Sequence, residues 1–280
     1  MRPRTLVGLF VLLALARPWP GMAQSPAIPV FWDIKERLQK PDLSEITRVR
    51  FLTTTDFPPF NFLDGSGRLT GFHIDLARAI CAELDIVDKC QIQALPWAEL
   101  EPAFQAKEGE AILAGLSVTA ASREKYAFSR SYLQFPARFA VAKAAKISEP
   151  IPGGLKGQRI GVVAGSAHEA MLRAYFPDVQ VVTFDKPELA SADLKAGKIS
   201  GVFGDGMRLA FWLAGSDSGG CCSFAGGPYL APEFLGTGMA VAVAKDNPAL
   251  AHAVDYALQQ ITARGTFAEL YLRYFPISFF

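Results

Sequence analysis

Two stretches, AFQAKEGEAILAG (103–115) and DLKAGKISGVFGD (193–205), share the pattern that decides the fold. Each finishes a helical segment, passes through a turn that contains glycine, and continues as a short apolar run. A short apolar run that follows such a turn is typical of a buried strand. The same helix–turn–strand step therefore occurs in two separate parts of the chain, as a weak internal repeat.

Strand and helix patterns alternate ahead of both stretches. The predicted strands are VRFLTTT (49–55), CQIQAL (90–95), the start of the second run QRIGVVAG (158–165), and VQVVTF (179–184). The predicted helices are the segment from Gly71 with apolar residues at helical spacing, WAELEPAFQA (97–106), SAHEAMLRAYF (166–176) and PELASADLKAG (187–197). This alternation predicts two α/β lobes, each with a mixed, mainly parallel sheet flanked by helices on both faces.

The N-terminus has the organisation of a secretory signal peptide. Arg2 and Arg4 precede an apolar run, Leu6–Ala16, and the small residues Gly21 and Ala23 flank a predicted cleavage site after Ala23. The run is too short to cross a bilayer as a permanent helix, although an uncleaved anchor is the alternative. Loss of three arginines from a net charge of +1 leaves about −2. With no Lys/Arg-rich run, this charge argues against a nucleic-acid partner.

Export permits disulfides, and the four cysteines form two pairs along the chain. Cys81 lies in a predicted helix and Cys90 opens the next strand, a spacing that can bring the two α-carbons into bonding range. We therefore predict a structural disulfide there. Cys221 and Cys222 are adjacent, so free thiols and a labile vicinal disulfide both remain open. The three histidines are not at ligand spacing from cysteines or carboxylates, so we expect no metal and no cofactor.

Ligands of open parallel sheets bind beyond the carboxyl ends of the strands. The residues there include aromatic and small side chains, one acid and two helix N-termini. A carboxylate would be held by helix-end N–H groups and by Arg123, which follows a helix start at Thr119. An ammonium would pair with Asp205. This set is the chemistry of a site for a small zwitterion, and its members are Phe57, Trp97, Gly115, Ser117, Arg123, Ser166, Ala167, His168 and Asp205.

At this point the chain resembles the family 3 periplasmic solute-binding proteins, the amino-acid-binding components of ABC transporters. The resemblance covers roughly residues 49–275. It is carried by DFPPFNF (56–62), GRLTGFHIDLARAI (67–80), ILAGLSVT (112–119), YAFSRSYL (126–133), LKGQRIGVVAGSAHEA (155–170), LKAGKISGVFGD (194–205) and GTFAELYLRYF (265–275). It implies the type II periplasmic-binding-protein fold, in which two lobes joined by two hinge crossings close on the ligand.

The resemblance assigns a role to each candidate residue. Phe57 and Trp97 match aromatic walls around the ligand, and Gly115 and Ser117 match ammonium and carboxylate contacts. Asp205 matches the acid that takes the α-ammonium. The second lobe's helix N-terminus, which meets the carboxylate and the side chain, is matched by Ser166, Ala167 and His168. Two alternatives remain open: Trp97 as a core residue, and Gly165-Ser166 as an ordinary turn.

The sequence departs from the family pattern at two positions. The family places an arginine three residues after the capping threonine, where this chain has Ser122 and then Arg123. We assign Arg123 as the carboxylate clamp, with Ser122 as the alternative occupant of the family position. Thr54 stands where many members have an acid that contacts the ligand side chain. Selectivity for a basic side chain is therefore not predicted.

We divide the chain into a signal peptide (1–23), a leader of unknown role (24–48), lobe 1 (49–136 and 233–280) and lobe 2 (137–232). The expected function is that of a monomeric periplasmic binding protein that captures a small zwitterion, a polar amino acid, and delivers it to the permease of an ABC transporter. One alternative is an enzyme on the same fold that resembles cyclohexadienyl dehydratase. The other is a periplasmic accessory or sensory binding protein without transport.

Overall fold

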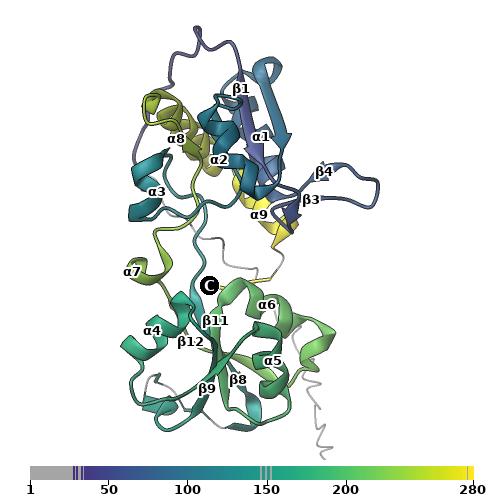
Figure 1. Ribbon diagram of the computed structural model, residues 1–280, viewed down its shortest axis with the longest axis vertical. Helices are drawn as coiled ribbons and strands as arrows, with labels where there is room; N and C mark the ends of the chain where they lie inside the picture. The colour runs from purple at the N-terminus through teal and green to yellow at the C-terminus, as the bar shows by residue number, and fades with distance from the viewer. Residues whose placement is uncertain are drawn as a thin grey trace, which may run out of the picture.

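The computed structural model describes residues 28, 30, 33, 35–145, 147–148, 150–151, 153–275 and 277–280. The predicted signal peptide lies outside the described residues, and the leader is described only in part. Two bodies lie one above the other in Figure 1, each built on a five-stranded sheet. We call the body on the sheet β5-β1-β6-β13-β7 lobe 1, and the body on the sheet β10-β9-β11-β8-β12 lobe 2.

The lobe 1 sheet is parallel except for one strand. β1 pairs in parallel with β5 and β6, whereas β13 runs antiparallel between β6 and β7. A small antiparallel sheet, β2-β3-β4, projects from the same lobe. The strands are β1 (Val49–Thr53), β2 (Asp56–Phe57), β3 (Asn61–Leu63), β4 (Leu69–Thr70), β5 (Cys90–Ala94), β6 (Ala111–Ile112), β7 (Ala127–Phe128) and β13 (Ala242–Val243).

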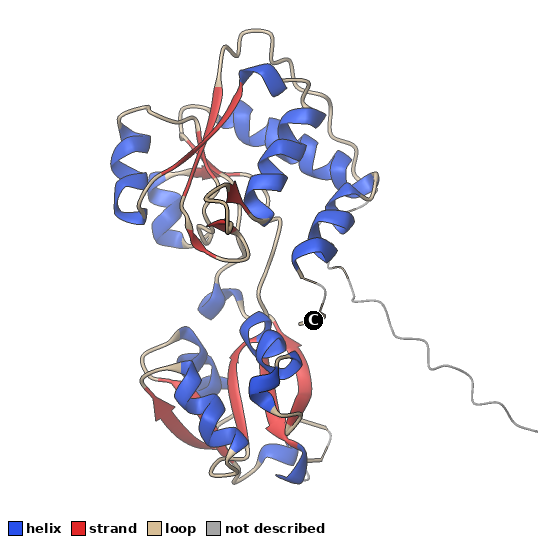
Figure 2. Ribbon diagram, turned by 90° about the vertical axis from the view of Figure 1, so that its right-hand side faces the viewer, coloured by secondary structure: helices blue, strands red, loops and turns tan. Residues whose placement is uncertain are grey.

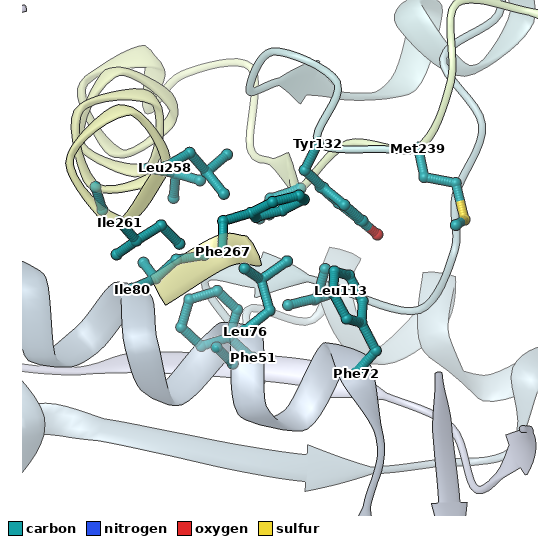
Figure 3. Packing of buried hydrophobic residues seen from close by; sticks show 14 of the residues in the cluster. Phe51, Phe72, Leu76, Ile80, Leu113, Tyr132, Met239, Leu258, Ile261 and Phe267 are labelled. Atoms are coloured by element: carbon teal, nitrogen blue, oxygen red, sulfur yellow. The ribbon is translucent and has the colours of Figure 1, made fainter. Parts of the chain in front are cut away.

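Helices cover both faces of the lobe 1 sheet. α1, α8 and α9 bury the larger core, in which Phe51, Leu76 and Phe267 meet (Figure 3). α2 covers the other face with Leu100 and Phe104. The helices of this lobe are α1 (Phe72–Glu83), α2 (Trp97–Gln105), α3 (Ala120–Lys125), α8 (Pro248–Ala263) and α9 (Thr266–Tyr274), with one short 3₁₀ turn, η1 (Val87–Lys89).

Lobe 2 repeats the arrangement. β10, β9 and β11 are parallel, and β8 runs antiparallel to both β11 and β12. α4 packs on one face, while α5 and α6 pack together on the other. The elements are β8 (Ala137–Ala142), β9 (Arg159–Val163), α4 (Ala167–Tyr175), β10 (Gln180–Phe184), α5 (Pro187–Lys195), β11 (Gly201–Asp205), α6 (Gly206–Ala214), β12 (Cys222–Tyr229), α7 (Pro232–Leu235) and the 3₁₀ turns η2 (Lys143–Ala145), η3 (Gly153–Leu155) and η4 (Ser216–Ser218).

The predicted fold class is confirmed: both lobes are mixed α/β layers. The segments between β7 and β8 and between α7 and β13 cross from one lobe to the other (Figures 1 and 2). They hydrogen-bond to each other, since Tyr132 donates its N–H to the Met239 carbonyl at 2.9 Å and Met239 donates to the Leu133 carbonyl at 2.7 Å. The side chains of Tyr132 and Met239 lie at one edge of the lobe 1 core (Figure 3).

Described residues of the leader lie against lobe 1. Gln259 of α8 accepts from the Leu38 N–H at 3.1 Å and donates to the Glu36 carbonyl at 2.9 Å. The Glu36 carboxylate pairs with both terminal nitrogens of Arg130, at the start of the first crossing. The leader thus contacts a helix of lobe 1 and one end of a crossing segment.

Both cysteine pairs are joined. Cys81, near the end of α1, is bonded to Cys90 at the start of β5, with the two α-carbons 6.3 Å apart. Cys221 and Cys222 form the vicinal disulfide. The described residues hold no free cysteine.

The Cys81–Cys90 bond closes a loop of nine residues. Its removal in the double variant Cys81→Ala/Cys90→Ala should lower the free energy of unfolding by about 2–3 kcal/mol in the chain-entropy model. Urea denaturation of the oxidised wild type and of the double variant measures this difference. Reduction of the Cys81–Cys90 bond should lower the urea midpoint of the wild type, whereas the double variant has no such bond to lose. Equal midpoints for the two oxidised proteins would contradict the prediction.

Candidate functional site

A cavity of about 150 Å³ lies between the lobes, beside the two crossings. Ser117 lines it from lobe 1, and His168 and Asp205 line it from lobe 2. The crossings supply further walls, among them Phe135 and Met239. Three of the predicted ligand-binding residues, distant in sequence, are therefore brought to one cavity.

Asp205 ends β11 and caps α6. Its Oδ1 accepts a hydrogen bond from the Arg208 N–H at 2.7 Å, so the carboxylate is fixed where the strand meets the helix. Burial raises the pKa of this carboxyl, and the nearby His168 opposes the shift. Burial lowers the pKa of His168, and Asp205 opposes that shift in turn. Burial therefore disfavours the charged form of each group, while their mutual attraction favours the charged forms of both.

The N-terminus of α4 faces the same region. The Ser166 hydroxyl accepts from the Glu169 N–H at 3.1 Å and donates to the Val163 carbonyl at 2.6 Å. Ala167 and His168 begin the helix, and amides of a first helical turn have no partner within the helix. Of these two residues His168 lines the cavity together with Asp205, and the N–H groups of such a helix start are suited to an anion.

On the lobe 1 side, Phe57 and Gly115 are in contact. Gly115 has a φ of +85°, and a Cβ there would lie 2.7 Å from the Phe57 ring and 3.3 Å from the Met239 sulfur. Only glycine fits this combination of left-handed backbone and close approach. The Phe57 ring also stacks on Phe60 at 4.6 Å between centroids. An aromatic surface therefore lies beside the loop that carries Ser117.

Six predicted residues lie outside the lining of this cavity: Phe57, Trp97, Gly115, Arg123, Ser166 and Ala167. Trp97, the first residue of α2, is 54% exposed, which excludes its alternative interpretation as a core residue. Arg123 is exposed, and its guanidinium makes no hydrogen bond or ion pair with the described residues. Ser122, one position earlier, donates its hydroxyl to the Ser117 carbonyl at 2.9 Å and forms a capping box with Thr119. The side chain at the family's arginine position thus turns toward Ser117.

A chain of buried polar groups runs from the end of β1 to the first crossing. Asn61 donates to Thr54 Oγ1 at 2.6 Å, and its Oδ1 lies 2.7 Å from His73 Nδ1. His73 Nε2 lies 2.9 Å from the Tyr132 hydroxyl. Since the Asn61 oxygen can only accept, His73 carries its proton on Nδ1 and Tyr132 donates. Burial lowers the pKa of His73 to about 3, so the ring is neutral.

Sequence reasoning missed the part of the cavity that the crossings form. Gln134 and Phe135 of the first crossing and Gly236 and Met239 of the second line it, together with Leu230, which lies just before α7. Connecting segments carry no periodic pattern, and their place in a cavity depends on how two lobes meet. The one signal in the sequence is the pair of glycines Gly236 and Gly238. Both adopt positive φ in the structure.

Two further features of the described residues concern metal binding and membrane insertion. No group of three or more histidine, cysteine, aspartate or glutamate side chains is arranged there to hold a metal ion. Within the same residues, no helix is both long and apolar enough to pass through a bilayer.

Comparison with known proteins identifies relatives over nearly the whole chain. The family model described as bacterial extracellular solute-binding proteins, family 3, matches residues 49–277. The ABC transporter arginine-binding protein 1 of Escherichia coli strain K12 is 30% identical over 233 residues, 83% of this chain and 93% of that protein. The histidine-binding periplasmic protein of Salmonella typhimurium strain LT2 is 29% identical over 234 residues, 82% of this chain and 88% of that protein.

Solved structures support the fold. An ancestral cationic amino acid solute-binding protein, a precursor of cyclohexadienyl dehydratase, has a TM-score of 0.62 to this chain at 24% identity. The match covers 82% of this chain and 96% of the ancestral protein. The two-lobed arrangement is therefore shared with a protein of known structure.

The buried histidine should make stability depend on pH. The pKa of His73 is about 3 in the folded protein and 6.5 in a free side chain, so between these values only the unfolded chain takes up the proton. The free energy of unfolding should therefore fall on acidification below pH 6.5, by up to ~1.4 kcal/mol per pH unit from this group. In His73→Gln this component should vanish.

Urea denaturation across this pH range measures the slope. His252→Gln, at an exposed position of α8, is the matched control and should keep the slope of the wild type. An unchanged slope in His73→Gln would show that the buried imidazole does not control acid stability.

Proposed function

This chain belongs to the bacterial extracellular solute-binding proteins of family 3, and we propose that it captures a small zwitterionic amino acid for the permease of an ABC transporter. One observation carries the proposal: residues of both lobes, Ser117, His168 and Asp205, line one cavity beside the crossings. A ligand that contacts both lobes binds the closed arrangement better than the open one. Differential affinity of this kind is what shifts a hinged protein toward closure.

The carboxylate of Asp205 is the proposed partner of the ligand's α-ammonium. It is the one acid among the described residues that line the cavity. The ligand's carboxylate is assigned to the N–H groups at the start of α4 and near Ser117, with Arg123 as its guanidinium partner. Phe57, Trp97 and Gly115 complete the proposed site on the lobe 1 side, and Ser166, Ala167 and His168 on the lobe 2 side.

The proposal also includes cleavage of the signal peptide and closure of the two lobes on the ligand. Export through the signal peptide, with cleavage after Ala23, would place a monomer in the periplasm. The closing bodies would be residues 49–136 with 233–280 and residues 137–232. The proposal assigns binding and no catalytic residue, in line with the names of the relatives as binding proteins. Consumption of a ring acid by the purified protein would instead favour the enzyme alternative.

A thermal-shift screen of the common amino acids tests the proposal directly. A ligand at a hundred times its dissociation constant should stabilise the folded protein by about 2.7 kcal/mol. Asp205→Asn should keep the shape of the site and lose the charge opposite the ammonium, which weakens binding by roughly 2–5 kcal/mol. Calorimetry on both proteins measures this loss, and an unchanged affinity would remove Asp205 from the site.

Binding should also depend on pH through the same group. Because burial raises the pKa of Asp205, acidification protonates this carboxyl earlier than an ordinary aspartate. The charged form is the one that attracts an ammonium, so the affinity should fall as the pH falls through that raised pKa. The fall should be absent in Asp205→Asn.

The arginine assignment is tested by a pair of substitutions. If Arg123 clamps the carboxylate, Arg123→Lys should bind ligand poorly, because an ammonium cannot form the bidentate fork. Ser122→Ala should retain most of the affinity. A ligand analogue without the carboxylate should be nearly indifferent to the loss of Arg123. The reverse order of effects would give the family position to Ser122 and leave Arg123 in solvent.

A further inference from the structure

A second cavity, of about 250 Å³, lies in lobe 2 directly beside the interlobe cavity. It occupies the space between the carboxyl ends of β9 and β11 and the first turns of α5 and α6. His168 and Asp205 line both cavities. A molecule whose ammonium pairs with Asp205 therefore stands at the boundary of the two and can extend into either.

The walls of this lobe 2 cavity are apolar and aromatic. Val202 comes from β11, and Leu209 and Trp212 come from α6. The volume exceeds the roughly 150 Å³ that suffices to hold a benzene molecule in an apolar protein cavity. The aromatic side chain of Trp212 in this wall favours a second ring in edge-to-face or offset contact. The size and the lining therefore fit a flat ring.

Gly204 keeps the lobe 2 cavity open. Its φ is not in the left-handed region, and a Cβ there would meet only the Leu209 side chain, at 4.0 Å. Neither backbone conformation nor close packing therefore requires glycine at this position. On α5, the small residues Ala190 and Ser191 face the same space. A larger side chain at any of these positions would fill the cavity.

The charges around the lobe 2 cavity disfavour a ligand whose side chain carries a positive charge in addition to its α-ammonium. Among the described residues that line it, Asp205 is the one acid. Glu188 of α5 lies at the outer groove beyond the cavity, and it is paired with Arg208 of α6 at 3.0 Å. An ammonium or guanidinium on the ligand side chain would therefore enter the cavity without a partner, at high cost.

We infer that the lobe 2 cavity receives the side chain of the bound amino acid, and that this side chain carries a neutral ring rather than an ammonium or guanidinium. The inference rests on the proposed function, since Asp205 must hold the α-ammonium at the boundary of the two cavities. The ring then lies against Trp212. The hydroxyls of Ser166 and Ser191 belong to the same lining and offer polar partners at its edge.

Calorimetry with the full mature protein tests the inference. The panel is L-histidine at pH 8, L-tyrosine and L-phenylalanine as ring-bearing ligands, L-arginine and L-lysine as basic ligands, and L-alanine as a ligand without the side chain in question. The wild type should bind one ring-bearing ligand at least ~10-fold more tightly than either basic ligand. Gly204→Val should weaken that binding by ~10-fold or more, because a misfit of a few methylenes has effects of this size. Its affinity for L-alanine should not change.

Two further variants make the result interpretable. Gly153→Val adds the same side chain at a lobe 2 position with open space around it, and it should bind as the wild type does. Ser191→Leu fills the cavity from α5 and should reproduce Gly204→Val even if the strand variant folds poorly. Melting temperatures without ligand establish that each variant is folded.

The outcomes separate the inference from the proposed function. Tightest binding of L-arginine or L-lysine, undiminished in Gly204→Val and Ser191→Leu, overturns the inference and leaves the proposed function in place. Failure of every amino acid to bind the wild type removes the proposed function and the inference together. Loss of ring-bearing ligands in both filled variants, with L-alanine retained, supports the inference.

Discussion

The pairing of the two crossing segments is the constraint on which the site depends. Met239 hydrogen-bonds with Tyr132 and Leu133, and it also bridges to Ser117. One residue of the returning segment is therefore held against both the outgoing segment and the loop after β6. This pairing lies beside the interlobe cavity, and it allows rotation of the lobes about a short strip of backbone rather than across a broad interface. Because this strip is narrow, Ser117 of lobe 1 and His168 and Asp205 of lobe 2 can line the same cavity beside it.

The buried polar chain extends this constraint into lobe 1. Tyr132 belongs to the crossing, and its hydroxyl donates to His73 of α1, which donates to Asn61 of β3 and so leads to Thr54 at the end of β1. Every partner is buried, so a break at any link would leave an unsatisfied polar group, at a cost of about 1–3 kcal/mol. The crossing is thereby tied to the sheet of lobe 1 at Tyr132.

Sequence reasoning located the parts of the site that lie at strand ends and helix starts. Asp205 and His168 could be found because an acid after an apolar strand, and a small-residue turn before a helix, are local patterns with a chemical meaning. Phe135 and Met239 could not be found in this way, because they line the cavity only through the meeting of two crossings. The antiparallel strands β8 and β12 were also missed, since strand direction is set by partners distant in sequence and not by the apolar pattern of a strand.

The helix starts on the two sides of the site differ in what they offer to an anion. α3 is a single short helix of six residues, and Thr119 and Ser122 satisfy each other's backbone N–H groups in a capping box. α4 has nine residues, and its capping Ser166 occupies the Glu169 N–H, while the Glu169 carboxylate takes the Gly165 N–H. The amides of Ala167 and His168 have no partner within the helix, and His168 lines the cavity with Asp205. A longer helix also carries the fuller set of aligned peptide dipoles. In the proposed site, lobe 2 would therefore offer the ligand's carboxylate the N–H groups at the start of α4 and its ammonium the carboxylate of Asp205, while Arg123 would offer the carboxylate its guanidinium from lobe 1. Lobe 1 would then add aromatic contact and the final hydrogen bonds as the lobes close.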